Sequence, residues 1–221
     1  MMLKKILLAL TLCSAVLSLS AAAAPKNGVD YLTLPTAQAT ASGKKIEVIE
    51  FFAYYCPHCD AFETALSAWV KAQGANIVFR RIHVQLNDAV APQQRLFFTL
   101  EALGLLEQYH DKVFRAMHVD RLRLNTDALV LDFIEKQGID RKKFSTAYRS
   151  FGVDARLRQA NAMMDAYRVD SWPMIAIDGR FLTSPAQANE GAKAAKNEAQ
   201  LHVQVLAVMD YLVATAKAEK K

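Results

Sequence analysis

Cysteine is scarce in this sequence: three occur among 221 residues, at positions 13, 56 and 59. The first lies in an N-terminal segment in which Lys4 and Lys5 precede the apolar run ILLALTLCSAVLSLS and the small residues AAAAP. A charged start, an apolar core and a small-residue end predict a secretory signal peptide, cleaved here near Ala23. The mature chain then holds only Cys56 and Cys59, which excludes a scaffold of several disulfides.

Two other interpretations of the N-terminus fit less well. A transmembrane anchor normally has ~20 apolar residues and lacks the small-residue end. A lipoprotein signal would need a small residue before its cysteine, whereas Leu12 precedes Cys13 and the apolar run continues past it. We therefore predict that residues 1–23 are a cleaved signal peptide and that the protein is exported.

Glycine and proline are also few, with 8 and 6 residues. The formal net charge of +5 falls to +3 when Lys4 and Lys5 leave with the signal, and no arginine-rich run alternates with aromatic residues. The composition therefore gives no support for nucleic-acid binding. Without internal repeats or low-complexity segments, the mature chain is expected to be ordered and globular, with one core or one domain that carries an insertion.

The first part of the mature chain has a strand–helix–strand pattern. The segment KIEVIEFFAYY (45–55) has the composition of a buried strand, a helical pattern runs until Gly74, and NIVFRRIHVQL (76–86) is a second strand. Such a unit normally gives parallel strands with a right-handed crossover. We assign residues 24–86 to the first part of an α/β domain.

The segment 87–168 has helical periodicity and no convincing strand. Apolar positions recur with a 3.6-residue period in APQQRLFFTLEALG, LLEQYHDKVFRAMH, TDALVLDFIEKQG, DRKKFSTAYRSFG and DARLRQANAMMDAYRV. We predict four or five consecutive helices that form an inserted helical domain.

Strand character returns in PMIAIDGRFLT (173–183), where Asp178-Gly179 is a strong hairpin-turn signal. An amphipathic helix is expected at about 198–217. Residues 169–221 therefore complete the α/β domain. A Cys-x-x-Cys pair after the first strand of such a chain is typical of thioredoxin-like folds.

The spacing of Cys56 and Cys59 points to reactivity, because a disulfide that closes so short a loop constrains the unfolded chain little. Cys56 is expected at the N-terminus of a helix, where unpaired N–H groups and the helix dipole favour negative charge. Pro57 suits the first helical turn, and His58 adds a polar neighbour that can carry a positive charge. Together these features lower the pKa of Cys56 and make the disulfide a stronger oxidant. Cys59, one turn further, would be the resolving cysteine.

Other uses of such a pair fit less well. Structural zinc normally has four ligands, and His83, His110 and His118 are scattered over a predicted strand and helices. Covalent haem attachment needs a histidine directly after the second cysteine, where Asp60 stands. We expect no metal site.

The segments EFFAYYCPHCDAFE and PMIAIDGRFLTSP, together with the helical insertion, resemble the DsbA family of bacterial periplasmic thiol–disulfide oxidases. The resemblance covers nearly the whole mature chain, and Cys-Pro-His-Cys is its most specific element. It implies a thioredoxin-like fold, in which a central mixed β-sheet is flanked by helices and carries an inserted all-helical domain. It also implies a periplasmic, monomeric enzyme without a bound cofactor.

The resemblance assigns further roles by position. Pro173 matches a cis-proline that lies opposite the cysteines and lets the preceding backbone pair with a bound peptide. Glu50 matches a buried acid that assists proton movement at the resolving cysteine, although the residues alone also allow a solvated carboxylate at a strand edge. Arg81 stands where relatives often have a lysine that pairs with this acid, and arginine keeps the charge but does not deprotonate.

Trp172 is the clearest departure, since relatives commonly have Val or Thr before the cis-proline. Its indole could crowd the cysteine pair, improve the peptide groove or pack in the core. One of Tyr54 and Tyr55 is also expected to line the groove. We predict Trp172 and Tyr55 as substrate-binding residues.

The leading hypothesis is an oxidase that donates the Cys56–Cys59 disulfide to unfolded, newly exported proteins with free cysteines. The resemblance implies reoxidation by a quinone-linked inner-membrane protein of the DsbB type. A reductase or isomerase of the same fold is the nearest alternative, although such isomerases usually carry a dimerisation domain, for which the stretch before residue 40 is too short. A peptide-binding holdase is the non-enzymatic alternative.

Overall fold

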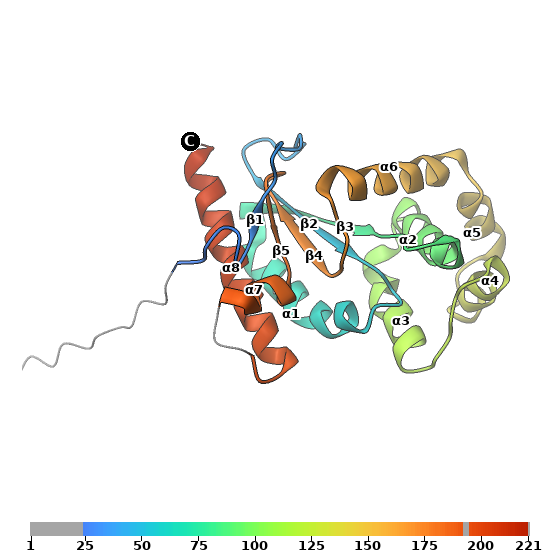
Figure 1. Ribbon diagram of the computed structural model, residues 1–221. Coiled ribbons are helices and arrows are strands. Elements are labelled where there is room, and N and C mark those ends of the chain that lie inside the picture. Colours follow the sequence, from blue (N-terminus) through green and yellow to red (C-terminus); the bar gives the residue numbers. More distant parts are fainter. Residues whose placement is uncertain (1–23, 192–194, 221) are drawn as a thin grey trace, which may run out of the picture.

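The computed structural model describes residues 24–191 and 195–220. The predicted signal peptide, residues 1–23, lies outside these described residues, so its cleavage stays a prediction. The described chain is built on a mixed sheet with helices packed against it and a group of helices beside it (Figure 1).

The sheet has five strands in the order β1-β5-β4-β2-β3. Its centre is β2 (Ile46–Phe52), which is parallel to β3 (Ile77–His83) and antiparallel to β4 (Met174–Ile177). The sheet continues from β4 to β5 (Phe181–Thr183) and then to β1 (Leu32–Thr33), with antiparallel pairing at both steps. All seven residues of β2 are buried, which explains its nearly continuous apolar run. The predicted thioredoxin-like sheet is confirmed.

Two long helices pack together against the sheet. The connection between the parallel strands is α1 (Pro57–Gln73), followed by the short turn η1 (Gly74–Asn76). The C-terminal helix α8 (Glu198–Glu219) contacts α1 and also β2, β4 and β5. Among the described residues, α8 is the one helix long and apolar enough to cross a membrane. Its apolar face fills the core instead, with Val205, Val208, Met209, Leu212 and Val213 buried.

Five helices lie between β3 and β4 in the chain and gather beyond the β3 edge of the sheet (Figure 1). They are α2 (Ala91–Ala102), α3 (Leu106–His118), α4 (Asp127–Lys136), α5 (Arg141–Tyr148) and α6 (Phe151–Tyr167), with η2 (Asp88–Val90) before them. Side chains of Thr126, Asp140 and Ser150 cap the last three helices, which gives each a definite start. The helical insertion is confirmed, and we propose 87–168 as its extent.

The hairpin between β4 and β5 turns at the predicted Asp178-Gly179 pair, where φ is 53° and 67°. A Cβ on Gly179 would lie 2.2 Å from the carbonyl oxygen of Gln38, so both the turn and the space require glycine. Besides the short turns η1 and η2, the strand β1 and the helix α7 (Pro185–Gly191) were not predicted. A two-residue strand and a short helix with the polar sequence PAQANEG carry too few apolar positions to show a period.

Candidate redox site at the N-terminus of α1

Cys56 is the N-cap residue of α1, as the sequence predicts. Both cysteines are free thiols, and the backbone N–H of Cys59 donates to Cys56 Sγ at 3.4 Å. The thiol of Cys56 faces the carbonyl oxygen of Trp172 at 3.6 Å. Cys59 is fully buried, whereas Cys56 keeps 6% of its surface exposed. Cys56 is therefore the sulfur that a substrate thiolate can reach.

The surroundings separate the acidities of the two thiols. A hydrogen bond from the Cys59 side chain, the backbone N–H groups of Cys59 and His58, and the charge of His58 together outweigh burial and lower the pKa of Cys56 to about 6. Burial and the neighbouring Cys56 sulfur raise the pKa of Cys59 above its ordinary value. The pair thus holds one thiolate and one thiol at neutral pH.

Pro57 occupies the first turn of α1, where a missing N–H breaks no helical hydrogen bond. His58 is exposed, and its Nδ1 lies 2.9 Å from Glu198 Oε1 at the start of α8. This hydrogen bond raises the pKa of His58. The imidazole therefore carries more positive charge beside the Cys56 thiolate than a free histidine would.

The Trp172–Pro173 peptide bond is cis, and Pro173 is buried. Trp172 is partly exposed, and its ring meets that of Tyr55 edge to face at 6.1 Å. The two aromatic residues line different cavities: Trp172 lies in one of about 150 Å³ beside His58, and Tyr55 in a wider one of about 640 Å³ beside Pro57. Cavities thus flank the cysteine pair on two sides. Tyr54, by contrast, is fully buried.

Glu50 is fully buried in β2, so the alternative of a solvated carboxylate is wrong. It does pair with Arg81, whose Nε donates to Glu50 Oε2 at 3.1 Å. Arg81 also donates to Glu63 Oε1 on α1 at the shorter distance of 2.6 Å. One guanidinium thus serves two buried carboxylates.

The two carboxylates respond differently to this arrangement. Burial raises the pKa of Glu50 to about 8, although Arg81 opposes the shift. For Glu63, hydrogen bonds from His110 and Ser67 and the charge of Arg81 outweigh burial and lower the pKa to about 2. Within the described part of the chain, Glu50 Oε1 has no hydrogen-bond partner. Glu50 can therefore carry a proton near neutral pH while Glu63 stays charged.

The histidines that seemed scattered in the sequence meet around one residue, Tyr54. Its backbone N–H donates to His83 Nε2 at 3.1 Å, its hydroxyl lies 3.0 Å from His110 Nδ1, and its carbonyl oxygen lies 2.8 Å from His118 Nε2. Burial lowers the pKa of His83 to about 3, so this ring is neutral. The cluster holds the corner two residues before Cys56, and sequence reasoning missed it together with Glu63. The one signal in the sequence was that His110 and His118 lie on the same helix, α3. Nothing in the sequence spacing connects them to Tyr54.

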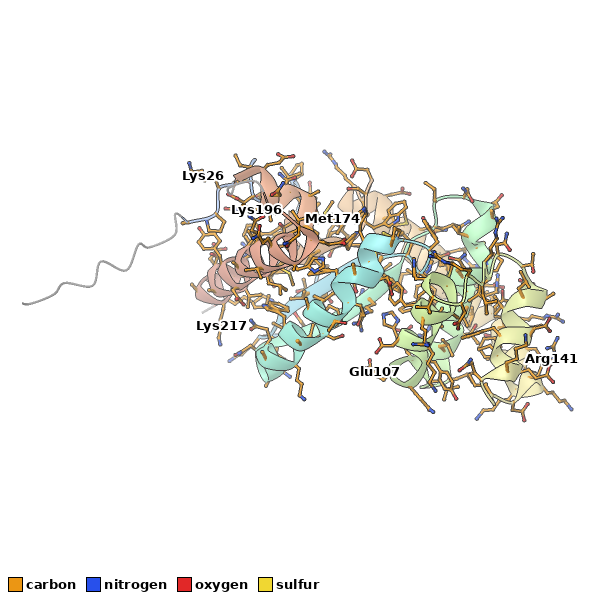
Figure 2. The ribbon with its side chains drawn as sticks, turned by 90° about the horizontal axis from the view of Figure 1, so that it is seen from below. Lys26, Glu107, Arg141, Met174, Lys196 and Lys217 are labelled. Carbon is orange, nitrogen blue, oxygen red and sulfur yellow. The ribbon has the colours of Figure 1, made fainter. Side chains whose placement is uncertain are left out.

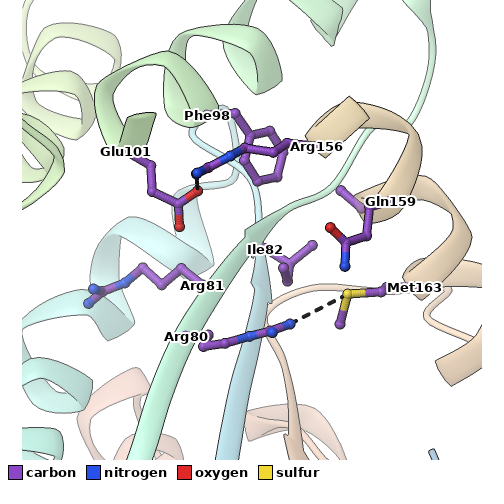
Figure 3. Close-up of a pocket in the computed structure, with 9 residues that line it drawn as sticks. Arg80, Arg81, Ile82, Phe98, Glu101, Arg156, Gln159 and Met163 are labelled. Carbon is purple, nitrogen blue, oxygen red and sulfur yellow. Dashed lines mark hydrogen bonds and ion pairs between the residues drawn. The ribbon is translucent and has the colours of Figure 1, made fainter. Parts of the chain in front are cut away.

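Another cavity, of about 240 Å³, lies between β3, α2 and α6 (Figure 3). Arg156 points to Glu101 across it, and Arg80 donates to the Met163 sulfur at 3.5 Å. No cysteine lines it. Within residues 24–191 and 195–220, no group of three or more His, Cys, Asp or Glu side chains is placed to hold a metal ion.

Comparisons with known proteins agree with this geometry. Residues 47–197 match the model of the DSBA-like thioredoxin domain family. The chain is 39% identical over 189 residues to the thiol:disulfide interchange protein DsbA of Burkholderia cepacia, a match that covers 85% of this chain and 89% of that protein. It is 31% identical over 154 residues to DsbA of Pseudomonas aeruginosa, covering 70% of this chain and 73% of that one.

Solved structures show the same likeness. A crystal structure of Pseudomonas aeruginosa DsbA superposes with a TM-score of 0.78 at 29% identity, covering 87% of this chain and 94% of that one. DsbA from Xylella fastidiosa shares the fold, with a TM-score of 0.77 at 24% identity and coverage of 88% and 98%. The cysteine pair at the start of α1, the mixed sheet with its helical insertion and these matches together establish that the chain belongs to the DsbA family of thioredoxin-like proteins.

Proposed function

We propose that this protein is a thiol–disulfide oxidase that transfers the Cys56–Cys59 disulfide to exported proteins while they fold. The observation that carries the proposal is the lowered pKa of Cys56 at the N-terminus of α1. A stabilised thiolate stabilises the reduced enzyme, and this makes its disulfide a stronger oxidant. The relatives named thiol:disulfide interchange protein support the same activity.

The reaction takes two exchange steps. A substrate thiolate attacks Cys56 Sγ, the Cys56–Cys59 bond breaks, and Cys59 leaves as a thiolate. A second substrate thiolate then attacks the substrate sulfur of the mixed disulfide, so that the substrate gains a disulfide and Cys56 leaves as a thiolate. Two electrons pass to the enzyme, and its low-pKa Cys56 is a good leaving group in the second step.

Glu50 is proposed to exchange a proton with Cys59. The Cys59 thiolate formed in the first step has a raised pKa and takes up a proton, and the charge of Glu50 acts on this thiol. With a pKa of about 8, Glu50 holds a proton at neutral pH. Arg81 cannot deprotonate, so its proposed role is to position Glu50 and balance its charge.

Trp172, Tyr55 and Pro173 are proposed to receive the substrate polypeptide. They adjoin Cys56: the Trp172 carbonyl oxygen faces its sulfur, and the two rings line the flanking cavities. An edge-to-face aromatic pair offers apolar surface with little loss of side-chain entropy on binding. His58 and Pro57 complete the proposed site by setting the acidity of Cys56.

Export and reoxidation follow from the sequence and the family. We propose a periplasmic location after cleavage of residues 1–23, action as a monomer without a bound cofactor, and reoxidation of the dithiol by a quinone-linked inner-membrane protein of the DsbB type. The likeness to DsbA relatives supports the location, and the reoxidising partner is proposed from the family resemblance alone.

Equilibration of the mature protein with glutathione buffers tests the oxidase. We expect a Cys56–Cys59 midpoint far more oxidising than the value of about −270 mV for thioredoxin. A midpoint near that value would favour a reductase. Replacement of both cysteines by serine distinguishes an oxidase from a peptide-binding holdase. A holdase would keep its function in this variant, and an oxidase would lose all of it.

A further inference from the structure

The cavity beside His58 combines an apolar wall with a carboxylate at its edge. Trp172, Pro173 and Leu201 supply apolar lining, and Glu198 adds the carboxylate. The Glu198 side chain is 43% exposed, so it meets solvent as well as the cavity. At about 150 Å³ the cavity is smaller than the roughly 300–1,000 Å³ of small-molecule sites. It therefore suits a single side chain of a bound polypeptide.

Glu198 is tied to the redox centre across 140 positions of sequence. Its Oε1 lies 2.9 Å from Nδ1 of His58, the second residue after Cys56. A carboxylate has several acceptor positions on its two oxygens, so it can hold His58 and accept another donor. A polypeptide attached to Cys56 would thus pass within reach of this charge.

His58 pairs with the Glu198 carboxylate, so the net charge at the edge of the cavity depends on the protonation of His58. Burial lowers the pKa of His202, which lines the same cavity, so this ring carries less positive charge than a free histidine would. The Cys56 thiolate is one of the groups that raise the pKa of His58. The oxidised enzyme has no Cys56 thiolate, so His58 carries less positive charge in that state. The negative charge of Glu198 is therefore least compensated in the redox state that meets substrate.

A long cationic side chain matches both features. The methylene stem of a lysine or arginine can cover the wall formed by Trp172 and Leu201, while its head donates to the carboxylate. A glutamate would be repelled at the same place, and a glutamine would gain the apolar contact without the charge.

We propose that Glu198 is a specificity-determining residue that selects substrate segments with a lysine or arginine close to the reacting cysteine. Because Glu198 is held by His58, which follows Cys56 by two residues, the cation would lie close to the reacting cysteine in the substrate sequence. The proposal rests on the proposed oxidase function, because the attack on Cys56 defines where the segment lies.

The test uses three synthetic dithiol peptides that are identical except for Lys, Gln or Glu two positions from the first cysteine. Their second-order rates of oxidation by the oxidised mature protein are measured at low ionic strength. We expect the lysine peptide to react roughly threefold to tenfold faster than the glutamate peptide, with glutamine between them, and added salt to shrink the ratio. In the Glu198→Gln variant the ratio should fall towards one.

Glu107→Gln is the matched control, because it also removes one negative charge. Glu107 lies on α3, away from Lys196, which precedes α8 in the chain (Figure 2). It should keep the wild-type ratio. Equal rates for the three peptides with the wild-type protein would overturn the proposal and leave the oxidase intact, as would a ratio that survives in Glu198→Gln. If the wild-type protein oxidises none of the peptides, the oxidase function itself fails, and this proposal fails with it.

Discussion

The two halves of β2 lie in different surroundings. Ile46 and Val48, near its start, pack among apolar side chains of α1 and α8 such as Leu66, Val205 and Leu212. From Glu50 onward the strand enters a region where apolar and aromatic side chains surround titratable groups. The buried members there include Glu50, Glu63, His83, His110, Tyr54, Cys56 and Cys59.

This difference separates stability from chemistry. Burying a polar or charged group costs free energy unless it is paired, whereas apolar burial stabilises the fold. Apart from Glu47, which is buried and pairs with Arg80, the first half of β2 therefore contributes stability, and the second half holds a paired set of titratable groups below the cysteines. Ligand sites at the carboxyl ends of strands follow the same arrangement in open α/β sheets.

Substitutions of Cys56 and Cys59, which follow the carboxyl end of β2, should have the largest effect on activity. Cys56→Ser is expected to abolish oxidation of a reduced, unfolded protein substrate, because no sulfur remains for the attacking thiolate. Cys59→Ser should also fail to oxidise the substrate, because it has no disulfide to donate. Its Cys56 thiolate can still attack the disulfide of an already oxidised protein, and the resulting mixed disulfides should accumulate in vivo, visible on non-reducing gels, because the Cys59 thiol that would release them is absent. Trapping by Cys56→Ser but not by Cys59→Ser would reverse the assigned roles.

Arg81→Met should be the most destabilising change in the titratable region. It leaves the charged Glu63 without its cation and Glu50 without its hydrogen-bond donor, and removing one partner of a buried ion pair costs about 3–5 kcal/mol. Urea unfolding measures the loss, which Arg81→Lys should partly restore. Arg141→Met, at an exposed pair on α5, is the matched control and should change little (Figure 2).

The stability gap between the reduced and oxidised forms should depend on pH. The pKa of Cys56 is about 6 in the fold and about 8.5 in an unfolded chain. Because the pKa of Cys56 is lower in the folded protein, the unfolded chain binds more protons at pH values between the two pKa values. The acidic Cys56 thiol therefore stabilises the reduced form fully above the unfolded pKa, and this stabilisation is lost as pH falls through 6. Its size is roughly 3 kcal/mol.

Urea unfolding of both redox forms from pH 5 to pH 9 tests this expectation. The reduced form should gain stability relative to the oxidised form as pH rises. Glu50, whose raised pKa lowers stability with rising pH in both forms, largely cancels in the difference. A gap that stays constant over this range would show that Cys56 is not an acidic thiol.

Leu212→Ala probes the apolar half. Leu212 is fully buried on α8, and such truncations cost about 2–5 kcal/mol. Ultraviolet titration of the thiolate should still give the wild-type pKa of Cys56, because Leu212 belongs to an apolar cluster that contains neither Cys56 nor Cys59. A shifted Cys56 titration would mean that the two halves of β2 are coupled.

Trp172→Val should have the smallest effect on stability. It removes the edge-to-face contact with Tyr55, worth roughly 1 kcal/mol. The change should raise KM for a peptide substrate severalfold, because apolar surface is lost beside Cys56. Tyr55→Leu is a useful companion variant, and an unchanged KM in both would remove the aromatic pair from the proposed substrate site.

Local features of the molecule could be predicted from the sequence. The strand-to-helix corner at Cys56, the hairpin turn at Asp178-Gly179 and the inserted helices, predicted as four or five, all follow from hydrogen bonds and apolar contacts within a few residues. Burial of Glu50 and the cis bond before Pro173 needed the family resemblance, since neither has a local sequence signature.

The sequence by itself thus determined most of the helices and strands, the position of the cysteine pair and the acidity expected of Cys56, because these depend on local contacts and, for Cys56, on the helix terminus and its immediate neighbours. Only the tertiary structure decided the partners of the polar side chains. It brought His83, His110 and His118 to Tyr54, placed Glu63 beside Arg81, and set Glu198 against His58. Residues so far apart in the chain meet because packing of α1, α3, α8 and the sheet fixes their positions, and buried polar groups must then be satisfied by whichever neighbours that packing supplies.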